Sequence, residues 1–198
     1  MTTYPITLPT TPKISAARFG LLSNTTLFSS PLTRVQQVLS RPGQVWQADC
    51  SLPMMLEATA APWRAALTSL RGRQGTFTLG DPAYTGARGT VAGTPLVNGA
   101  SQTGNNLITD GWGASATILK GDYFALGNYL YIMTIDVTAT GGGAATLTFE
   151  PTLRASPANN AAVTVSSPKA LMRLTADDAR WEETPGLWGM SFNCVEAL

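Results

Sequence analysis

Side chains suited to catalysis are scarce in this sequence. It contains no histidine, which excludes a His general base and a Ser-His-Asp triad. Its carboxylates cluster only at Asp177–Asp178 and Glu182–Glu183, in a polar connector before Pro185. Paired carboxylates can hydrolyse a glycoside when they are held about 5 to 9.5 Å apart. A solvated connector or a contact between subunits explains these four residues more simply, so we expect no enzyme.

Metal and cofactor sites are equally hard to assemble. The two cysteines, Cys50 and Cys194, are too few for a four-thiolate zinc site. Both fall at inward positions of alternating segments, which predicts buried thiols. The glycine-rich stretch 138–145 lacks the lysine of a phosphate-binding loop, and Lys120–Asp122 fits a turn better than an adhesion motif. We therefore expect no cofactor and no metal.

The low share of charged residues points to an assembly. Asp, Glu, Lys and Arg make up 13% of the 198 residues, against about 25% in an average soluble protein. A weakly charged surface does little to keep copies apart, although a neutral soluble monomer is the alternative. A net charge of +1 argues against a protein that neutralises nucleic-acid phosphates, so we expect no sequence-specific nucleic-acid partner.

Membrane and export signals are not evident in the pattern. No apolar run reaches the roughly 18 residues of a membrane span, and we expect no membrane insertion. The opening segment 1–13 lacks the basic and apolar regions of a signal peptide. We therefore expect a protein made in the cytoplasm, with reduced thiols.

Short strands joined by turns are expected in the first part of the chain. Residues 32–39 and 45–52 are predicted to form a β-hairpin around a turn at 40–43, where Pro and Gly suit a tight turn. The second strand alternates apolar and polar residues, with Trp46 and Cys50 on the apolar side. The hairpin is therefore expected to bury one face.

One helix is predicted to follow. Apolar residues recur at spacings of four, three, four and three between Leu56 and Leu70, which makes one apolar stripe. Pro62 is tolerable if the helix begins near Thr59, because an N–H in the first turn has no partner. Gly72 is expected to end the helix. The apolar stripe should then pack across a sheet that includes a strand at 76–79.

The rest of the chain divides into two patterns. About five short strands in about 60 residues after Ile118 predict a small antiparallel β-barrel. The tail alternates again at Met190, Phe192 and Cys194, and we expect it to pair with the strand at 45–52. The predicted domains are residues 1–82 together with 171–198, and an inserted barrel at residues 83–170.

Recurring residue patterns over most of the chain resemble one family. In the first half they are Arg41-Pro42-Gly43 before Trp46, Leu52-Pro53, Trp63, the run from Leu70 to Phe77, and Gly80-Asp81-Pro82. In the second half they are residues 119–139, 151–154 and 163–174, and a C-terminal stretch of the form W–PGLWGMSF–EAL. These segments resemble the distal tail proteins of siphophages that infect Gram-negative bacteria, most weakly over residues 83–117.

The resemblance implies a mainly β fold and a structural role. Distal tail proteins form a hexameric ring through a β-sandwich belt domain with one helix, and a small OB-like barrel decorates the outside. A protein of this kind is assembled in the host cytoplasm and resides in the virion, at the tail tip. Its ring joins the tail tube protein to the tail-tip hub and leaves a lumen for the tape measure protein and DNA. The resemblance leaves a host-surface glycan open as a ligand of the barrel.

Charged residues suggest where copies could meet. The candidate interface joins Arg71 and Arg73 of one copy to Asp177, Asp178, Glu182 or Glu183 of the next. For the two arginines, interaction with the end of the helix dipole is a sufficient structural reason.

Two other functions stay open at this point. A carbohydrate-binding adhesin module is the alternative, because Trp112, Tyr84 and Tyr123 could stack on sugars, although such residues also fill barrel cores. Another minor tail protein is a related possibility.

Overall fold

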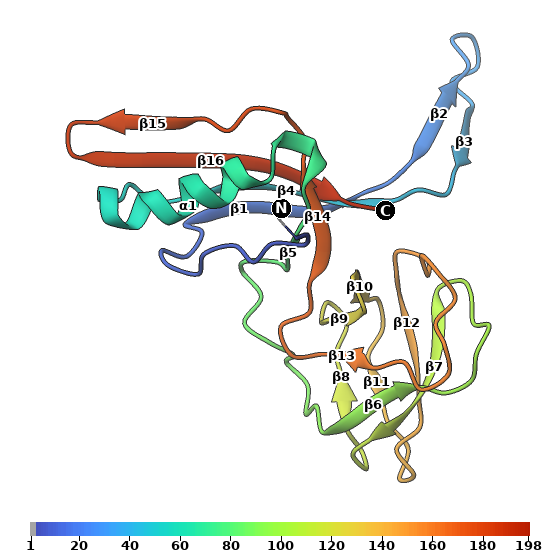
Figure 1. Ribbon diagram of the computed structural model, residues 1–198. Helices are drawn as coiled ribbons and strands as arrows, with labels where there is room; N and C mark the ends of the chain where they lie inside the picture. Colours follow the sequence, from blue (N-terminus) through green and yellow to red (C-terminus); the bar gives the residue numbers. More distant parts are fainter. Residues whose placement is uncertain (1–2) are drawn as a thin grey trace.

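The computed structural model describes residues 3–198 (Figure 1). Within that range the chain forms two six-stranded antiparallel sheets, two short two-stranded sheets and a single α-helix. The expected mainly β class with one helix and a small barrel is confirmed.

The first sheet combines strands from both ends of the sequence. Its path runs through β1 (Ala16–Leu22), β4 (Val45–Ser51), β16 (Leu187–Glu196), β14 (Ala170–Leu174) and β5 (Phe77–Leu79), and β15 (Trp181–Thr184) pairs with the first part of β16. Phe192 lies opposite Cys50. The expected pairing of the tail with the strand at 45–52 is therefore confirmed.

The helix α1 (Glu57–Ser69) covers one face of this sheet. Its Trp63 stacks on Phe192 of β16 (ring centres 6.3 Å apart), and Trp63 and Leu67 belong to the same buried core as Trp46 and Cys50 of β4, which are at most 2% exposed. Alternation in a strand and the three- and four-residue spacing in a helix thus produce one shared core. The buried face predicted for the strand at 45–52 is confirmed.

The helix begins earlier than expected. It starts at Glu57 rather than near Thr59, so Pro62 lies inside it and not in its first turn. A proline there removes one backbone hydrogen bond, and the burial of Trp63 one residue later offsets that loss. The helix ends at Ser69, and Arg71 and Gly72 then adopt left-handed conformations (φ 53° and 65°).

The hairpin predicted over 32–52 is wrong. β3 (Gln36–Ser40) pairs with β2 (Thr25–Ser29) and not with β4. The turn lies at Ser30–Arg34, where Ser30 N donates to Val35 O (2.9 Å) and Arg34 is left-handed (φ 59°). The Pro42–Gly43 segment instead links the hairpin to β4. In Figure 1 the β2–β3 hairpin projects from the body of the molecule.

The second sheet is a nearly closed barrel. Its order is β13 (Val163–Thr164), β9 (Tyr123–Leu126), β10 (Tyr129–Met133), β12 (Ala145–Glu150), β7 (Asn106–Trp112) and β6 (Gly93–Val97), with β8 (Thr117–Ile118) and β11 (Val137–Thr138) as a separate pair. Backbone bonds link Val97 to Asn160 (2.8 Å) and to Ala161 (2.9 Å) and nearly close it. β14, which follows β13 in the sequence, does not join the barrel but belongs to the first sheet.

The predicted domain limits can be placed on these elements. The limit at 82/83 falls between β5 and β6, and the limit at 170/171 falls inside β14, one residue after its start.

Candidate interaction surfaces

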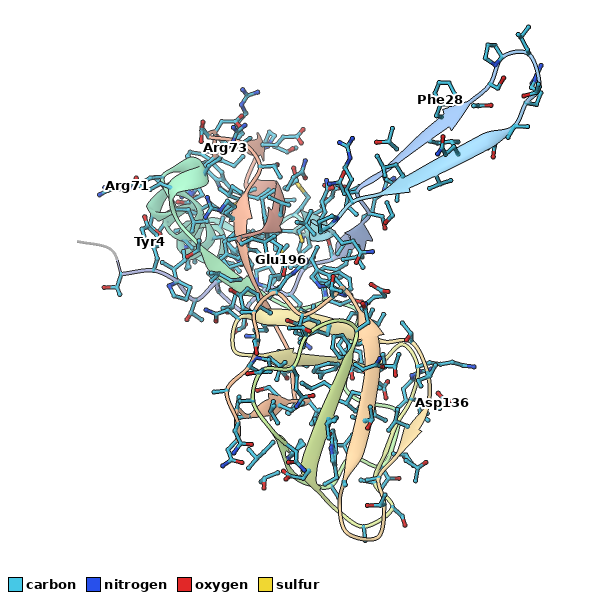
Figure 2. All side chains as sticks on the ribbon, turned by 90° about the vertical axis from the view of Figure 1, so that its right-hand side faces the viewer. Tyr4, Phe28, Arg71, Arg73, Asp136 and Glu196 are labelled. Carbon is cyan, nitrogen blue, oxygen red and sulfur yellow. The ribbon has the colours of Figure 1, made fainter. Side chains whose placement is uncertain are left out.

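Arg71 and Arg73 follow the helix, at the short 3-10 turn η1 (Gly72–Gln74). The Arg73 backbone N–H donates to Asp177 Oδ1 (3.0 Å), and its Nε donates to Thr175 O (2.8 Å). Arg73 and Asp177 are therefore brought together within one chain. Figure 2 shows Arg71 and Arg73 on the same side of the molecule, far from the projecting hairpin.

The other acidic candidates lie further along the same connector. Asp178 forms an exposed ion pair with Arg180 (2.6 Å). Glu182 and Glu183 lie on β15, where all four residues are exposed. Among residues 3–198, neither of these glutamates has an ion-pair partner. That the six candidates lie between subunits stays a prediction, and among residues 3–198 three of them, Arg71, Glu182 and Glu183, have no ion-pair partner.

The β2–β3 hairpin exposes apolar side chains that no other part of residues 3–198 covers. Every residue of both strands is exposed. The buried face expected for the predicted hairpin is therefore wrong for its first strand, residues 32–39. We call its apolar residues the hairpin surface: Leu27 (57% exposed), Phe28 (65%), Leu32 (93%), Val35 (67%), Val38 (64%) and Leu39 (53%). Figure 2 shows Phe28 on the projecting arm, away from the rest of the molecule.

Both faces of this hairpin are partly apolar. Leu27 lies opposite Val38 on one face, while Phe28 and Leu39 lie on the other. An isolated two-stranded hairpin is marginally stable in water, and exposed contiguous apolar patches mark interaction sites. The sequence signal was available, since residues 23–40 contain many apolar residues and only one charge, Arg34. The spacing of apolar residues does not indicate whether such side chains are buried within their own chain or stay exposed.

A second apolar surface lies where α1 begins beside the β15–β16 turn. We define the tip surface as the exposed Met54, Leu56, Trp181 and Leu187, together with Glu182 and Glu183. It extends around the end of the sheet, because Trp181 and Glu183 lie on the side of β15 that faces α1 and Glu182 and Leu187 lie on the other side. The backbones of Met55 and Trp188 exchange two hydrogen bonds (2.9 and 2.7 Å), which hold the start of the helix against β16.

Arg64 of α1 contacts aromatic residues of β15 and β16 beside the tip surface. Its guanidinium carbon lies 4.3 Å from the ring centre of Trp188 and 5.7 Å from that of Trp181. The same side chain forms an ion pair with Glu57. Arg64 therefore contacts side chains of the helix, β15 and β16 together, and each of these contacts favours their close packing.

The two surfaces lie at opposite ends of the molecule. In Figure 1 the turn between β15 and β16 is at the far left, and the end of the β2–β3 hairpin is at the upper right. One chain therefore cannot fold its hairpin onto its own tip.

The aromatic residues considered for sugar binding do not form an open platform. Trp112 is 5% exposed, and its indole N–H donates to Thr109 Oγ1 (2.8 Å). Tyr84 and Tyr123 pack against each other with ring centres 5.0 Å apart. Burial, and then the charge of Asp81, raise the pKa of Tyr123, whose hydroxyl donates to Asp81 (3.1 Å).

The Lys120–Asp122 segment is a turn, as expected. Asp122 N donates to Leu119 O (2.9 Å), and Gly121 is left-handed (φ 86°). The Asp122 carboxylate is fully buried, where it accepts hydrogen bonds from Leu119 N and from Arg88. It is therefore unavailable as an adhesion motif.

Both cysteines are buried free thiols, as the sequence predicted. They lie on the neighbouring strands β4 and β16. The hydrogen bond to Cys50, together with burial, raises the pKa of Cys194. Because Cys194 stays protonated, it is a poor nucleophile and a poor metal ligand. The same hydrogen bond lowers the pKa of Cys50, and it is burial that keeps reagents from this second thiol.

The described residues show neither a metal cluster nor a helix that could span a membrane. Within residues 3–198, no three His, Cys, Asp or Glu side chains gather closely enough to hold a metal ion. None of the helices in the described part of the chain has the length and apolar character of a membrane span. A comparison of the chain with protein-family models finds no match, and a comparison with curated proteins finds no relative.

Proposed function

We propose that this protein is a structural subunit of a hexameric ring at the tail tip of a siphophage, where the ring joins the tail tube to the tip hub. The observation that carries the proposal is the pair of exposed apolar surfaces, hairpin and tip, at opposite ends of the chain (Figure 1). Surfaces of this kind are normally covered by another protein. The protein is therefore part of an assembly.

A ring is the arrangement that such surfaces favour. Contacts in a cyclic ring larger than a dimer are heterologous, so each subunit needs two different, complementary patches. A two-fold dimer would need only one self-complementary patch. The low charge of the chain, 13% of residues, also suits a subunit that is covered by its neighbours.

The polar face of the first sheet is suited to line a channel. Facing away from α1, it exposes Gln47, Ser51, Ser191 and Asn193. Asp49, on the same face, lies opposite Arg18, so the charges balance locally. The same face also carries Arg173 and the exposed Leu22. It is mainly polar and not strongly basic, so it would retain DNA phosphates less than a basic wall would.

The partners and location come from the sequence resemblance to distal tail proteins. It supports contacts with the tail tube protein on one side, and with the hub and tape measure proteins on the other. The carbohydrate-binding alternative lacks support from the barrel aromatics, since Trp112 is buried and Tyr84 packs against Tyr123.

Location is tested by labelling particles that contain this chain. Gold-conjugated antibodies raised against the chain are expected to mark the distal end of the tail in electron micrographs, near the point where the tube meets the tip. Antibodies against the tail tube protein, which should mark the whole tail length, are the control. Label on the capsid, or along side fibres only, would contradict the proposed position.

A further inference from the structure

We infer that the hairpin surface of one copy docks on the tip surface of the neighbouring copy. The inference rests on the proposed function, because it takes the occupant of both surfaces to be this chain. It replaces the arginines first considered for the interface, Arg71 and Arg73, by Arg34 and Arg41 of the hairpin, and it retains Glu182 and Glu183.

Charge complementarity selects this pairing. Residues 23–44, the hairpin and its flanks, contain two arginines, Arg34 and Arg41, and no acidic residue. Residues 181–188 contain two glutamates and no basic residue, and among residues 3–198 neither glutamate has an ion-pair partner. Opposite charges around an interface steer encounter and fix its register. A hairpin–hairpin contact would bring arginines together, and a tip–tip contact would bring glutamates together.

Apolar character supports the same pairing. The hairpin offers Phe28 and Leu32, 65% and 93% exposed, and the tip offers Leu56 and Trp181, 66% and 45% exposed. Burying such side chains provides most of the favourable free energy in an interface, and aromatic residues are common at its centre. Within the described residues of one chain, these side chains stay exposed.

Backbone geometry gives the hairpin a way to attach. β15 pairs with β16 on one side, and no strand of residues 3–198 pairs with its other edge. The β2–β3 hairpin likewise has strand edges that are not paired within these residues. Unpaired edges are templates for pairing with another chain, so β15 and the incoming hairpin can extend one sheet from copy to copy.

Cysteine cross-linking tests the contact directly. The native thiols are buried, so an added surface cysteine is the reactive one. We expect the variant carrying Leu32→Cys and Leu187→Cys to give a ladder of covalent multimers with a short bismaleimide, whereas either single variant stops at dimers. Leu32→Cys combined with Ile108→Cys, an exposed barrel position, is the matched control. Equal ladders from both combinations, or none from the first, would overturn the pairing.

Charge reversal tests the same contact through the strength of self-association. Arg34→Glu with Arg41→Glu, and separately Glu182→Lys with Glu183→Lys, should each weaken self-association at least about tenfold at low salt. Combining all four substitutions should restore it. Lys120→Glu with Lys169→Glu changes the net charge as the arginine pair does and should have little effect.

The outcomes separate this inference from the proposed function. Rings that persist unweakened after either reversal, or a weakening that the combined variant does not reverse, would overturn the pairing and leave the ring in place. Absence of any self-association in the unaltered chain would overturn the ring itself.

Discussion

The carboxylate of Glu196 is fully buried where the barrel meets the first sheet, and Arg154 of the barrel side binds both of its oxygens. Arg154 Nη2 lies 2.5 Å from Glu196 Oε2, and Nε lies 3.2 Å from Oε1. The Trp46 backbone N–H also donates to Oε2 (3.1 Å). In Figure 2 Glu196 lies at this junction. The indole N–H of Trp46 donates to Leu130 O (2.7 Å) across the same junction.

Breaking this ion pair should be costly. Arg154→Met leaves a buried carboxylate without its counter-charge, which costs about 3 to 5 kcal/mol. We expect urea unfolding to report a loss of that size in the free energy of unfolding. Arg180→Met removes an exposed ion pair with Asp178 and should change it by less than about 1 kcal/mol. Equal losses in the two variants would contradict the role assigned to burial.

The turn before β12 depends on one glycine. Gly143 is left-handed (φ 77°), and a Cβ there would lie 2.3 Å from Trp112 O. Gly143→Ala should therefore destabilise the barrel by about 1 to 3 kcal/mol. Gly141, in the same turn, has no heavy atom within 4 Å of its Cβ position, and Gly141→Ala is the control. Thermal melting should show a lower melting temperature for Gly143→Ala than for Gly141→Ala. An equal decrease in both variants would contradict the steric argument.

The two thiols should be unreactive in the folded protein. Cys50 is 1% exposed and Cys194 is 0% exposed, and the raised pKa of Cys194 keeps it protonated at neutral and mildly basic pH. A chromogenic disulfide reagent at pH 8 should detect no free thiol until denaturant is added, and then two. Rapid reaction of either thiol under native conditions would show that the β4–β16 core opens readily.

The hairpin surface should contribute to association and not to the fold of one chain. Phe28→Ser removes an exposed side chain, so the free energy of unfolding of the monomer should change by less than about 0.5 kcal/mol. Self-association should weaken in the same variant. Phe124→Ser, at a fully buried barrel position, is the contrasting variant and should cost about 3 kcal/mol or more. A large loss of monomer stability from Phe28→Ser would contradict an external role for the hairpin.

Alternation and spacing predicted the parts of the fold that bury one side locally. The strand around Cys50, the strand around Cys194 and the helix around Trp63 each show a clear period, because a sheet or helix surface in the core imposes one. The sequence could not predict the partner of residues 36–40. The apolar residues of this segment would have the same spacing whether they packed against their own chain or against another copy.

The site residues were predictable to different degrees. Glu182 and Glu183 stood out as a charge cluster in the sequence. Arg34 and Arg41 did not, because single arginines beside turns are common. The Arg154–Glu196 pair was not predicted either, since nothing in the sequence distinguishes two ordinary charges 42 residues apart that meet only when the barrel docks on the first sheet.

The central proposal is that six copies of this chain close into a ring. The most direct test is the mass of the purified protein, measured by light scattering over a wide concentration range, with negative-stain class averages of the same samples. We predict a species of six times the 20.8 kDa chain mass that appears as a six-fold ring with an open centre. A protein that stays at the mass of one chain at every concentration would contradict the account.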